Sequence, residues 1–423
     1  MMAFKSRWPI CNGMTMHNLE ISLPLAQITA LGECLMDVSV STFGDLNSRT
    51  LVEWEQLFEM QTGPANPFTA PDWARSWYEA WSTEREQRVY LVRSKGELIG
   101  VAPMQSQRVQ VGPFSMARRI VPIGTRDGSY ALELPQLLVR RGEERKVLRA
   151  ATQAMMGGDA SQNAHWVELS IPIEQGWFEP EWVYDTQTKA AYMRHQMTRP
   201  VCLLRLGESW DATRAGFSRN AKESLRRSRN RLTKSGANVE IVEFANDLDR
   251  TTVDRFINFH AMRSAEQSRI RHHDAYSEER ERNLMRDLLP RLGRARRAAI
   301  LELRLDGTPI AAQLVLYAPN TLYIHSSGFD PATWSMGPVV HLQGEAMRRA
   351  CEEGRQWVNL SPGITLSKLR WGAHVHPFND FAFGVGSRGA ARRFELFSAL
   401  KTVNQVRAST DQAAVNAAPP RAK

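Results

Sequence analysis

The sequence predicts an α/β protein of two halves, each a mixed, mostly antiparallel sheet flanked by helices. Two observations support this fold class. Both halves show the same order of predicted elements: helices, an antiparallel hairpin or meander, a further strand, a helix and a last strand. The clearest part of this pattern, residues 298–360, is a meander followed by a glycine loop, a helix and a buried strand. Because no repeat of short period accompanies it, the pattern indicates a duplicated domain rather than a solenoid.

The length and charge agree with this organisation. A chain of 423 residues suffices for two domains, each with its own core. The formal net charge of +9 favours polyanionic partners: nucleic acid, phosphate-rich cofactors or an anionic membrane surface. A soluble basic protein without any such partner would carry the same charge, so composition alone decides nothing about binding.

Cysteine usage and hydropathy bear on the compartment. The four cysteines are widely scattered and form no CxxC pair, which argues against a disulfide framework and a zinc site. No window reaches the ~18 apolar residues of a membrane span, and the first residues lack the apolar core of a signal peptide. We therefore expect a cytoplasmic protein, with the inner face of the cytoplasmic membrane as the alternative place.

The first half, 48–197, is expected to follow a weakly structured leader at 1–47. Its helices are predicted where tryptophan and leucine recur at helical spacing, and its hairpin where alternating strands flank Lys95–Gly96. The expected elements are helices at 48–60, 69–81 and 143–156, a hairpin at 88–104, and strands at 118–124, 133–139 and 165–171.

The second half, 198–404, shows the same order with a stronger signal, and a disordered tail is expected at 405–423. Its meander has strong turn chemistry at Asp306–Gly307 and Pro319–Asn320. The expected elements are a strand at 198–206, helices at 211–235, 250–267 and 277–292, the meander at 298–329, and a strand at 356–360.

A further helix is predicted to begin at Gly337–Pro338, because proline at the first helical position sacrifices no needed N–H group. A helix N-terminus on a glycine loop presents free N–H groups and a partial positive charge, which suits a phosphate. The alternative is an ordinary crossover without a ligand. We expect Ser335, Met336, Gly337 and Val339 to bind the phosphates of a donor.

Short motifs recur in a fixed order between residues 304 and 372. They are Asp306-Gly307, Pro309-Ile310-Ala311-Ala312, Gly328-Phe329-Asp330-Pro331, Gly337, Leu342, Glu345, Ala346, Ala350, Gly354, Pro362-Gly363 and Lys368. In this order they resemble the domain of the CelD/BioF2-like acetyltransferases, which belong to the Gcn5-related N-acetyltransferase (GNAT) superfamily. This family is related to the Fem peptidyltransferases, which use aminoacyl-tRNA. The first half is similar to the family in residues 66–81 and 88–104.

The resemblance implies tandem GNAT-like domains, the first one degenerate, and an acyltransferase that uses acyl-CoA, acetyl-CoA in the first place, without a metal. It also implies a role in bacterial cell-envelope or exopolysaccharide metabolism. Asn359-Leu360 and Ser367 depart from the usual family residues, and 330–340 lacks the Q/R-x-x-G-x-G/A signature of acetyl-CoA binding. A Fem-like transferase that uses aminoacyl-tRNA, and a non-catalytic scaffold, therefore remain alternatives.

Two residues are candidates for catalysis in such a transferase. Lys368, on a loop beside the donor helix, is predicted to stabilise the oxyanion that forms during acyl transfer. His325, in the last meander strand, is a candidate base with a pKa suited to neutral pH. The alternatives are a solvated surface lysine and a hydrogen-bonded strand histidine.

Four further residues are candidates for contact with the acceptor, which we expect in a cleft between the halves. Glu302 and Gln313 interrupt apolar strands, where a buried polar group needs a partner. They line the acceptor site or, by default, face solvent. Asn359 and Trp371 flank the loop that leads to Lys368. The cluster His272-His273-Asp274 is not assigned to a metal, because adjacent side chains rarely point at one ion.

Residues 214–234 predict an amphipathic helix with a broad basic face. The predicted polyanion-binding residues are Arg226, Arg227, Arg229 and Arg231. Such a face binds a polyphosphate, a tRNA backbone or an anionic lipid headgroup, or it is simply a solvated helix surface. No aromatic residues are interleaved with these arginines, which argues against stacking on RNA bases.

Overall fold

The computed structural model describes residues 36–81, 86–111, 114–125, 133–134, 136–157, 164–172, 190–266, 272–385, 389–390 and 392–400. All the described residues fall in one compact unit, so both predicted halves belong to the same unit. No helix in these ranges is both long and apolar enough to span a membrane.

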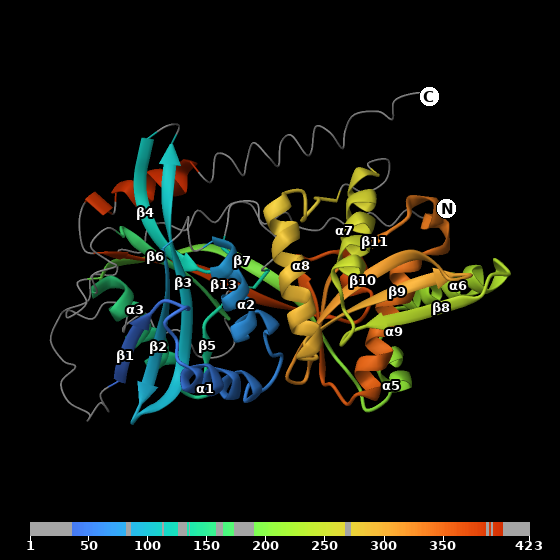
Figure 1. The fold of residues 1–423 in the computed structure, drawn as a ribbon, viewed down its shortest axis with the longest axis horizontal. Coiled ribbons are helices and arrows are strands. Elements are labelled where there is room, and N and C mark those ends of the chain that lie inside the picture. The colour runs from blue at the N-terminus through green and yellow to red at the C-terminus, as the bar shows by residue number, and fades with distance from the viewer. Residues whose placement is uncertain are drawn as a thin grey trace, which may run out of the picture. The chain divides into compact units, whose positions relative to one another are not determined.

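The first half is a meander followed by a helical crossover (Figure 1). Strands β2, β3 and β4 pair antiparallel, and β6 then pairs parallel to β4 after helix α3. Tyr90 and Val92 of β2 pack on the α3 side, whereas Val89 and Leu91 pack with α1 and α2. The elements are β1 (Met36–Ser41), α1 (Ser48–Glu59), α2 (Pro71–Trp81), β2 (Gln87–Ser94), β3 (Glu97–Val111), β4 (Phe114–Pro122), β5 (Leu138–Val139), α3 (Glu144–Gly157) and β6 (Trp166–Pro172).

The second half repeats this topology. Strands β9, β10 and β11 form the antiparallel meander, and β12 pairs parallel to β11 after helix α9. The elements are β7 (Ala190–Arg205), α5 (Trp210–Ala215), α6 (Arg219–Lys234), β8 (Val239–Phe244), α7 (Arg250–Ala265), α8 (Glu279–Arg294), β9 (Ala298–Leu305), β10 (Thr308–Ala318), β11 (Thr321–Phe329), α9 (Pro338–Glu352), β12 (Trp357–Pro362), α10 (Leu366–Leu369) and β13 (His374–Val385). The predicted tandem arrangement of two mixed, mostly antiparallel sheets is confirmed, and the two are continuous as one 13-stranded sheet in the described residues.

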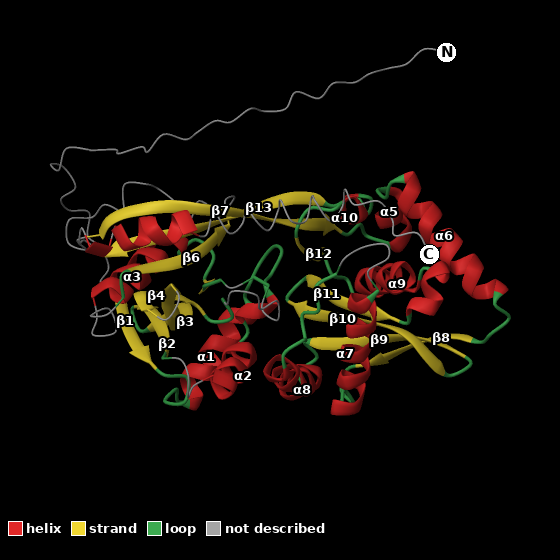
Figure 2. Cartoon of the chain, turned by 90° about the horizontal axis from the view of Figure 1, so that it is seen from above, coloured by secondary structure: helices red, strands yellow, loops and turns green. Residues whose placement is uncertain are grey.

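The two sheets join edge to edge through the long strands β7 and β13. β13 pairs with β6 of the first half and with β7, which in turn pairs with β12 (Figure 2). One hydrophobic cluster contains side chains from both halves, including Trp77 of α2 and Leu288 of α8. Ion pairs add to the contact: Arg297, just before β9, pairs with Glu55 and Glu59 of α1.

The structure corrects several predicted elements. The expected leader contains β1, which pairs with β2, so residues 36–41 are a sheet edge. The helix expected at 211–235 is two helices, because the Ser218 side chain accepts a hydrogen bond from the Ala221 N–H and caps a new start. Strands β8 and β13 had no prediction. The domain limits at 197/198 stay a prediction, although β7 crosses them, and 405–423 lies outside the described residues.

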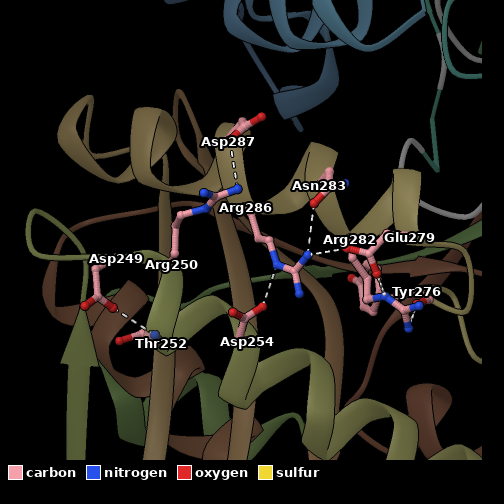
Figure 3. Close-up of polar contacts among 10 residues, drawn as sticks. All are labelled: Asp249, Arg250, Thr252, Asp254, Tyr276, Glu279, Arg282, Asn283, Arg286 and Asp287. Atoms are coloured by element: carbon pink, nitrogen blue, oxygen red, sulfur yellow. Dashed lines mark hydrogen bonds and ion pairs between the residues drawn. The ribbon is translucent and has the colours of Figure 1, made fainter.

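A ladder of ion pairs holds α7 against α8 (Figure 3). The Arg286 guanidinium lies 2.6 Å from Asp254 of α7 and 2.6 Å from Glu279 of its own helix. Arg282 also pairs with Glu279, and its Nη1 donates to the Tyr276 carbonyl. These contacts fix the helix that covers one face of β10 and β11.

Helix α7 lies so close to β11 that one strand residue must be glycine. A Cβ atom on Gly328 would lie 2.2 Å from the His260 nitrogen and 2.2 Å from the Phe259 carbonyl carbon, both of which are backbone atoms. Backbone cannot rotate away as a flexible side chain can, so a side chain here would displace α7.

We predict that Gly328→Ala lowers the free energy of unfolding by at least about 2 kcal/mol. Gly157→Ala is the matched control, because no atom lies within 4 Å of its added Cβ and its φ is not positive. Urea denaturation of both variants measures the difference. Equal stability of the two variants would show that the approach of α7 to β11 is less tight than the structure indicates.

Candidate active site

Strands β11 and β12 separate in the middle of the second sheet. They pair only from Thr321 to Tyr323 on β11, opposite Trp357 to Asn359 on β12. On the other side of β11, the register with β10 shifts, and His325 is the extra residue of this bulge. A bulge re-aims side chains and ends regular pairing. Backbone pairing between β11 and β12 therefore ends beside His325 and the end of β12, and we refer to this end of pairing as the opening of the sheet.

A carboxylate from the first half meets β11 at this opening. The Tyr323 hydroxyl donates to Glu133 Oε2 at 2.5 Å, and the Phe68 ring contacts the rings of Tyr323 and His325. Burial raises the pKa of Glu133, while the nearby His325 opposes this shift. Burial and the adjacent Glu133 also raise the pKa of Tyr323 far above its usual value. The site is thus built from both halves.

The loop that carries Glu133 is tied to the end of α1 and η1 (Pro67–Thr69) by a buried asparagine. Asn66 Nδ2 donates to the Leu134 carbonyl at 2.9 Å and to Gln136 Oε1 at 2.9 Å. Next to it, the Ala65 N–H donates to Thr321 Oγ1 at the start of β11. The same segment therefore positions both the carboxylate and the strand that it meets.

Lys368 lies close by, but its ammonium faces the backbone. Nζ is 2.6 Å from the Pro362 carbonyl, 3.2 Å from that of Gly363 and 3.1 Å from that of Ser361. An ammonium has three N–H donors, and these carbonyls use them. Burial lowers the pKa of Lys368, and Glu133 opposes the shift. The structure thus gives Lys368 a role in holding the loop, and its contact with an oxyanion stays a prediction.

Asn359 shapes the same loop. Its Oδ1 accepts a hydrogen bond from the Ser361 N–H at 2.9 Å, and Ser361 has a φ of 64°. A positive φ is costly for a residue with a Cβ, so the turn needs such support. Asn359 itself is buried at the point where β11 and β12 stop pairing.

The predicted donor loop ends in a left-handed glycine that directly precedes α9. Gly337 has φ 68° and ψ 45°, Pro338 begins α9, and no side chain caps the helix start. Ser228 of α6 donates to the carbonyls of Met336 and Gly337, and Arg231 donates to the Ser335 carbonyl. The loop carbonyls are thereby turned toward α6. Val339 lies in the first turn, which contains no acidic residue.

The corresponding helix of the first half differs at its start. Helix α3 has Glu144 in its first turn, and this carboxylate accepts a hydrogen bond from the Gly142 N–H at 2.8 Å. A carboxylate at a helix N-terminus repels a second anion. The two described crossovers therefore differ in charge at their helix starts: α3 has a carboxylate there and α9 has none.

The basic helix α6 packs beside the donor loop. Arg226, Arg227, Arg229 and Arg231 are all exposed. Arg226 and Arg227 share the Glu223 carboxylate, whose pKa their hydrogen bonds lower to about 2. Arg229 lies within electrostatic reach of His341 on α9. The structure thus brings the predicted polyanion-binding residues next to the predicted donor-binding residues.

Three predicted acceptor residues lie inside the protein. Glu302 is fully buried and pairs with Arg255 at 2.8 Å and with Arg304 at 2.7 Å, so the default expectation of a solvent-facing side chain is wrong. Gln313 is also fully buried, and its amide donates to the Ser326 carbonyl at 2.7 Å. Trp371 packs edge-on against Phe217 in the core. Their substrate contacts stay predictions.

Sequence reasoning missed Glu133, Tyr323 and Phe68. Tyr323 could have been predicted from the sequence, because it precedes His325 by two residues and strand alternation places both on one face. Glu133 gave no signal, because its proximity depends on how the two halves associate. The side chains of the cluster His272-His273-Asp274 do not converge on one point. His272 contacts Arg263, whereas Asp274 pairs with His260.

Comparisons with known proteins agree with this topology. The family model of an acetyltransferase (GNAT) domain matches residues 219–368, which confirms the predicted resemblance. The fold is similar to the crystal structure of FemX, with a TM-score of 0.60 and 12% identity over 82% of this chain and 98% of that one. A tandem GNAT protein from the clavulanic acid biosynthesis pathway is also similar, with a TM-score of 0.41 and 11% identity over 84% and 99%. The sequence matches no curated protein significantly.

A histidine beside the site makes stability depend on pH. Burial lowers the pKa of His260 to about 4, although Asp274 opposes the shift. An unfolded histidine has a pKa near 6.5, so the folded state binds fewer protons between pH 6.5 and 4. The contribution of His260 to the free energy of unfolding is therefore fully present above pH 6.5 and is lost as the pH decreases from 6.5 to 4.

We predict that His260 accounts for about 3 kcal/mol of the loss between pH 7 and 4. His260→Gln should make this part of the pH profile shallower, measured by urea denaturation at each pH, while His272, whose pKa burial also lowers to about 4, keeps its own contribution. His374→Gln, at an exposed position on β13, should keep the wild-type profile. An unchanged slope in His260→Gln would contradict the assignment.

Proposed function

We propose that this chain transfers an acyl group from an acyl-CoA-type thioester to an amine, because the model of an acetyltransferase (GNAT) domain matches residues 219–368. Acetyl-CoA is the first candidate donor. The observation that carries the proposal is the start of α9, which has no side-chain cap and no acid and is flanked by the arginines of α6. The role in cell-envelope or exopolysaccharide metabolism rests on the resemblance alone.

The donor phosphates would lie at the start of α9. Ser335, Met336, Gly337 and Val339 form this turn, and proline at position 338 leaves the following N–H groups pointing outward. The helix dipole favours negative charge there, and Arg231 and Arg229 add positive charge from α6. A diphosphate bound here would accept hydrogen bonds from the backbone N–H groups at the start of α9 and from the arginine side chains of α6.

The acyl group would reach the opening between β11 and β12. During transfer, a C–N bond forms at the thioester carbonyl carbon and the C–S bond breaks. The amine loses one proton, and the departing sulfur gains one. Glu133 is suited to accept the amine proton, because its raised pKa makes it a stronger base, and Tyr323 is placed to relay it. His325 is the second candidate base, beside them on β11.

A Fem-like reaction is the second candidate, favoured by the exposed arginines of α6. Arg226, Arg227, Arg229 and Arg231 form a basic surface next to the donor loop, where a tRNA backbone would also bind. The two donors differ in measurable ways. A tRNA contact predicts steeply salt-dependent binding that weakens when these four arginines become glutamine, whereas coenzyme A binding depends mainly on the start of α9.

We predict that Val339→Glu weakens coenzyme A binding about tenfold or more, because it adds a negative charge to the first turn of α9. Val239→Glu is the matched control at a half-buried position on β8. Isothermal titration calorimetry with coenzyme A measures both, after thermal unfolding shows that both are folded. If the wild type binds aminoacyl-tRNA and no coenzyme A, the second candidate replaces the first.

We also predict that Glu133→Gln lowers kcat about 10²–10⁴-fold with little change in donor affinity, since it removes the base and not the donor site. Glu240→Gln, an exposed position on β8, should retain wild-type turnover. Thiol release from acetyl-CoA with a panel of amines provides the assay. Full activity in Glu133→Gln would leave His325 as the base.

A further inference from the structure

A second group of polar side chains lies further along β11, beyond the bulge. Arg263 of α7 donates from Nη1 to Ser327 Oγ at 2.6 Å and to the Ser327 carbonyl at 3.1 Å. Its Nη2 lies 2.8 Å from His272 Nε2, and its guanidinium lies 5.9 Å from the centre of the Phe329 ring. Neither the phosphate site at α9 nor the proposed chemistry uses these groups.

The charge of Arg263 has no counter-ion. Among the described residues no carboxylate lies within ion-pair distance of Arg263, and Asp274, across the loop, pairs with His260. Burial lowers the pKa of Arg263 to about 10. Its Nε is buried and has no hydrogen-bond partner. Buried charges in proteins are normally paired, because an isolated charge is costly to remove from water.

The neighbours of Arg263 add no negative charge. Burial and the adjacent Arg263 lower the pKa of His272 to about 4, so this imidazole is neutral at pH 7. His260 lies within electrostatic reach of both Arg263 and His325, and its lowered pKa likewise leaves it neutral. Arg263, His272 and Ser327 together therefore carry one positive charge, which suits an oxyanion.

The distance to the reaction site fits a small acceptor. Ser327, which Arg263 contacts, follows His325 by two residues on β11, a separation of about 7 Å along a strand. An amine and an oxyanion a few bonds apart would span this separation.

We propose that Arg263, supported by His272 and Ser327, binds an oxyanion of the acceptor, either a carboxylate or a phosphate. The acceptor is then an anionic amine whose nitrogen lies near Tyr323 and His325. The identity of this anion as part of the acceptor rests on the proposed transferase function. The binding of an anion at Arg263 does not, so the two are tested separately.

The first experiment measures anion binding without turnover. Inorganic phosphate and acetate are titrated separately into the full chain, and the imidazole NMR signals are followed. His272 reports on Arg263, whereas His341 reports on the start of α9. We expect saturable shifts of His272 with at least one anion, and the tighter anion identifies the phosphate or the carboxylate class. No saturable shift of His272 with either anion overturns the proposal.

Variants separate a binding role from a structural one. Arg263→Gln should weaken the binding reported by His272 about tenfold or more, while Arg294→Gln, at an exposed position on α8, should leave it unchanged. Arg263→Lys keeps the charge and loses the planar fork, so it should bind with intermediate affinity. Equal affinity in Arg263→Gln and wild type overturns the proposal.

Stability provides the second readout. A guanidinium without a counter-ion should destabilise the free protein, so Arg263→Met should keep or raise Tm in anion-free buffer. The anion that shifts His272 should raise Tm of the wild type and not of Arg263→Met. If Arg263→Met unfolds at a lower temperature and the anion stabilises both proteins equally, Arg263 is structural. A failure of catalysis with intact anion binding would contradict only the transferase proposal.

Discussion

The separation of β11 from β12 is the constraint on which the rest of the site depends. Two parallel neighbours normally pair along their length, because unpaired backbone groups inside a protein are costly. Here pairing ends at Tyr323 and Asn359, and other groups compensate on each side. The bulge at His325 absorbs the change on β11, while Lys368 and Asn359 hold the turn that follows β12. Regular strand pairing is therefore interrupted at the place where we expect the chemistry.

The duplicated topology explains why one chain needs both halves. The second half has a helix start that suits an anion, and the first half has Glu144 in the equivalent place. The first half instead contributes Glu133 and Phe68, which reach β11 across the junction. In our proposal one crossover binds the donor, and the other supplies a carboxylate. A second-half domain alone would lack Glu133, the base that we propose.

Much of the fold was predictable because its signals are local. Helices α2 and α9 show apolar residues at helical spacing, and the turns at Lys95–Gly96 and Asp306–Gly307 take positive φ, as their sequences indicate. Strand β13 was not predictable from its sequence, since its role depends on pairing with β6 and β7, which are distant along the chain. The same reason hides Glu133. The helix start at Gly337–Pro338 was predictable, because proline is tolerated at the first helical position.

The charged residues around β9 and β11 differ in whether an opposite charge contacts them, and this difference separates residues that support the fold from residues that we propose bind the acceptor. Glu302 is buried with two arginines and is electrostatically satisfied, so it supports the fold. Glu133 and Arg263 differ, since burial shifts the pKa of each toward its neutral form and neither has a counter-ion in direct contact among the described residues. The Glu133 carboxylate and the Arg263 guanidinium are not adjacent: Glu133 contacts Tyr323, and Arg263 contacts Ser327, four residues further along β11. A substrate with an ammonium group near one end and an anion near the other would complement both. In the free protein Glu133 and Arg263 are electrostatically unfavourable, and the acceptor that we propose would place an opposite charge beside each of them.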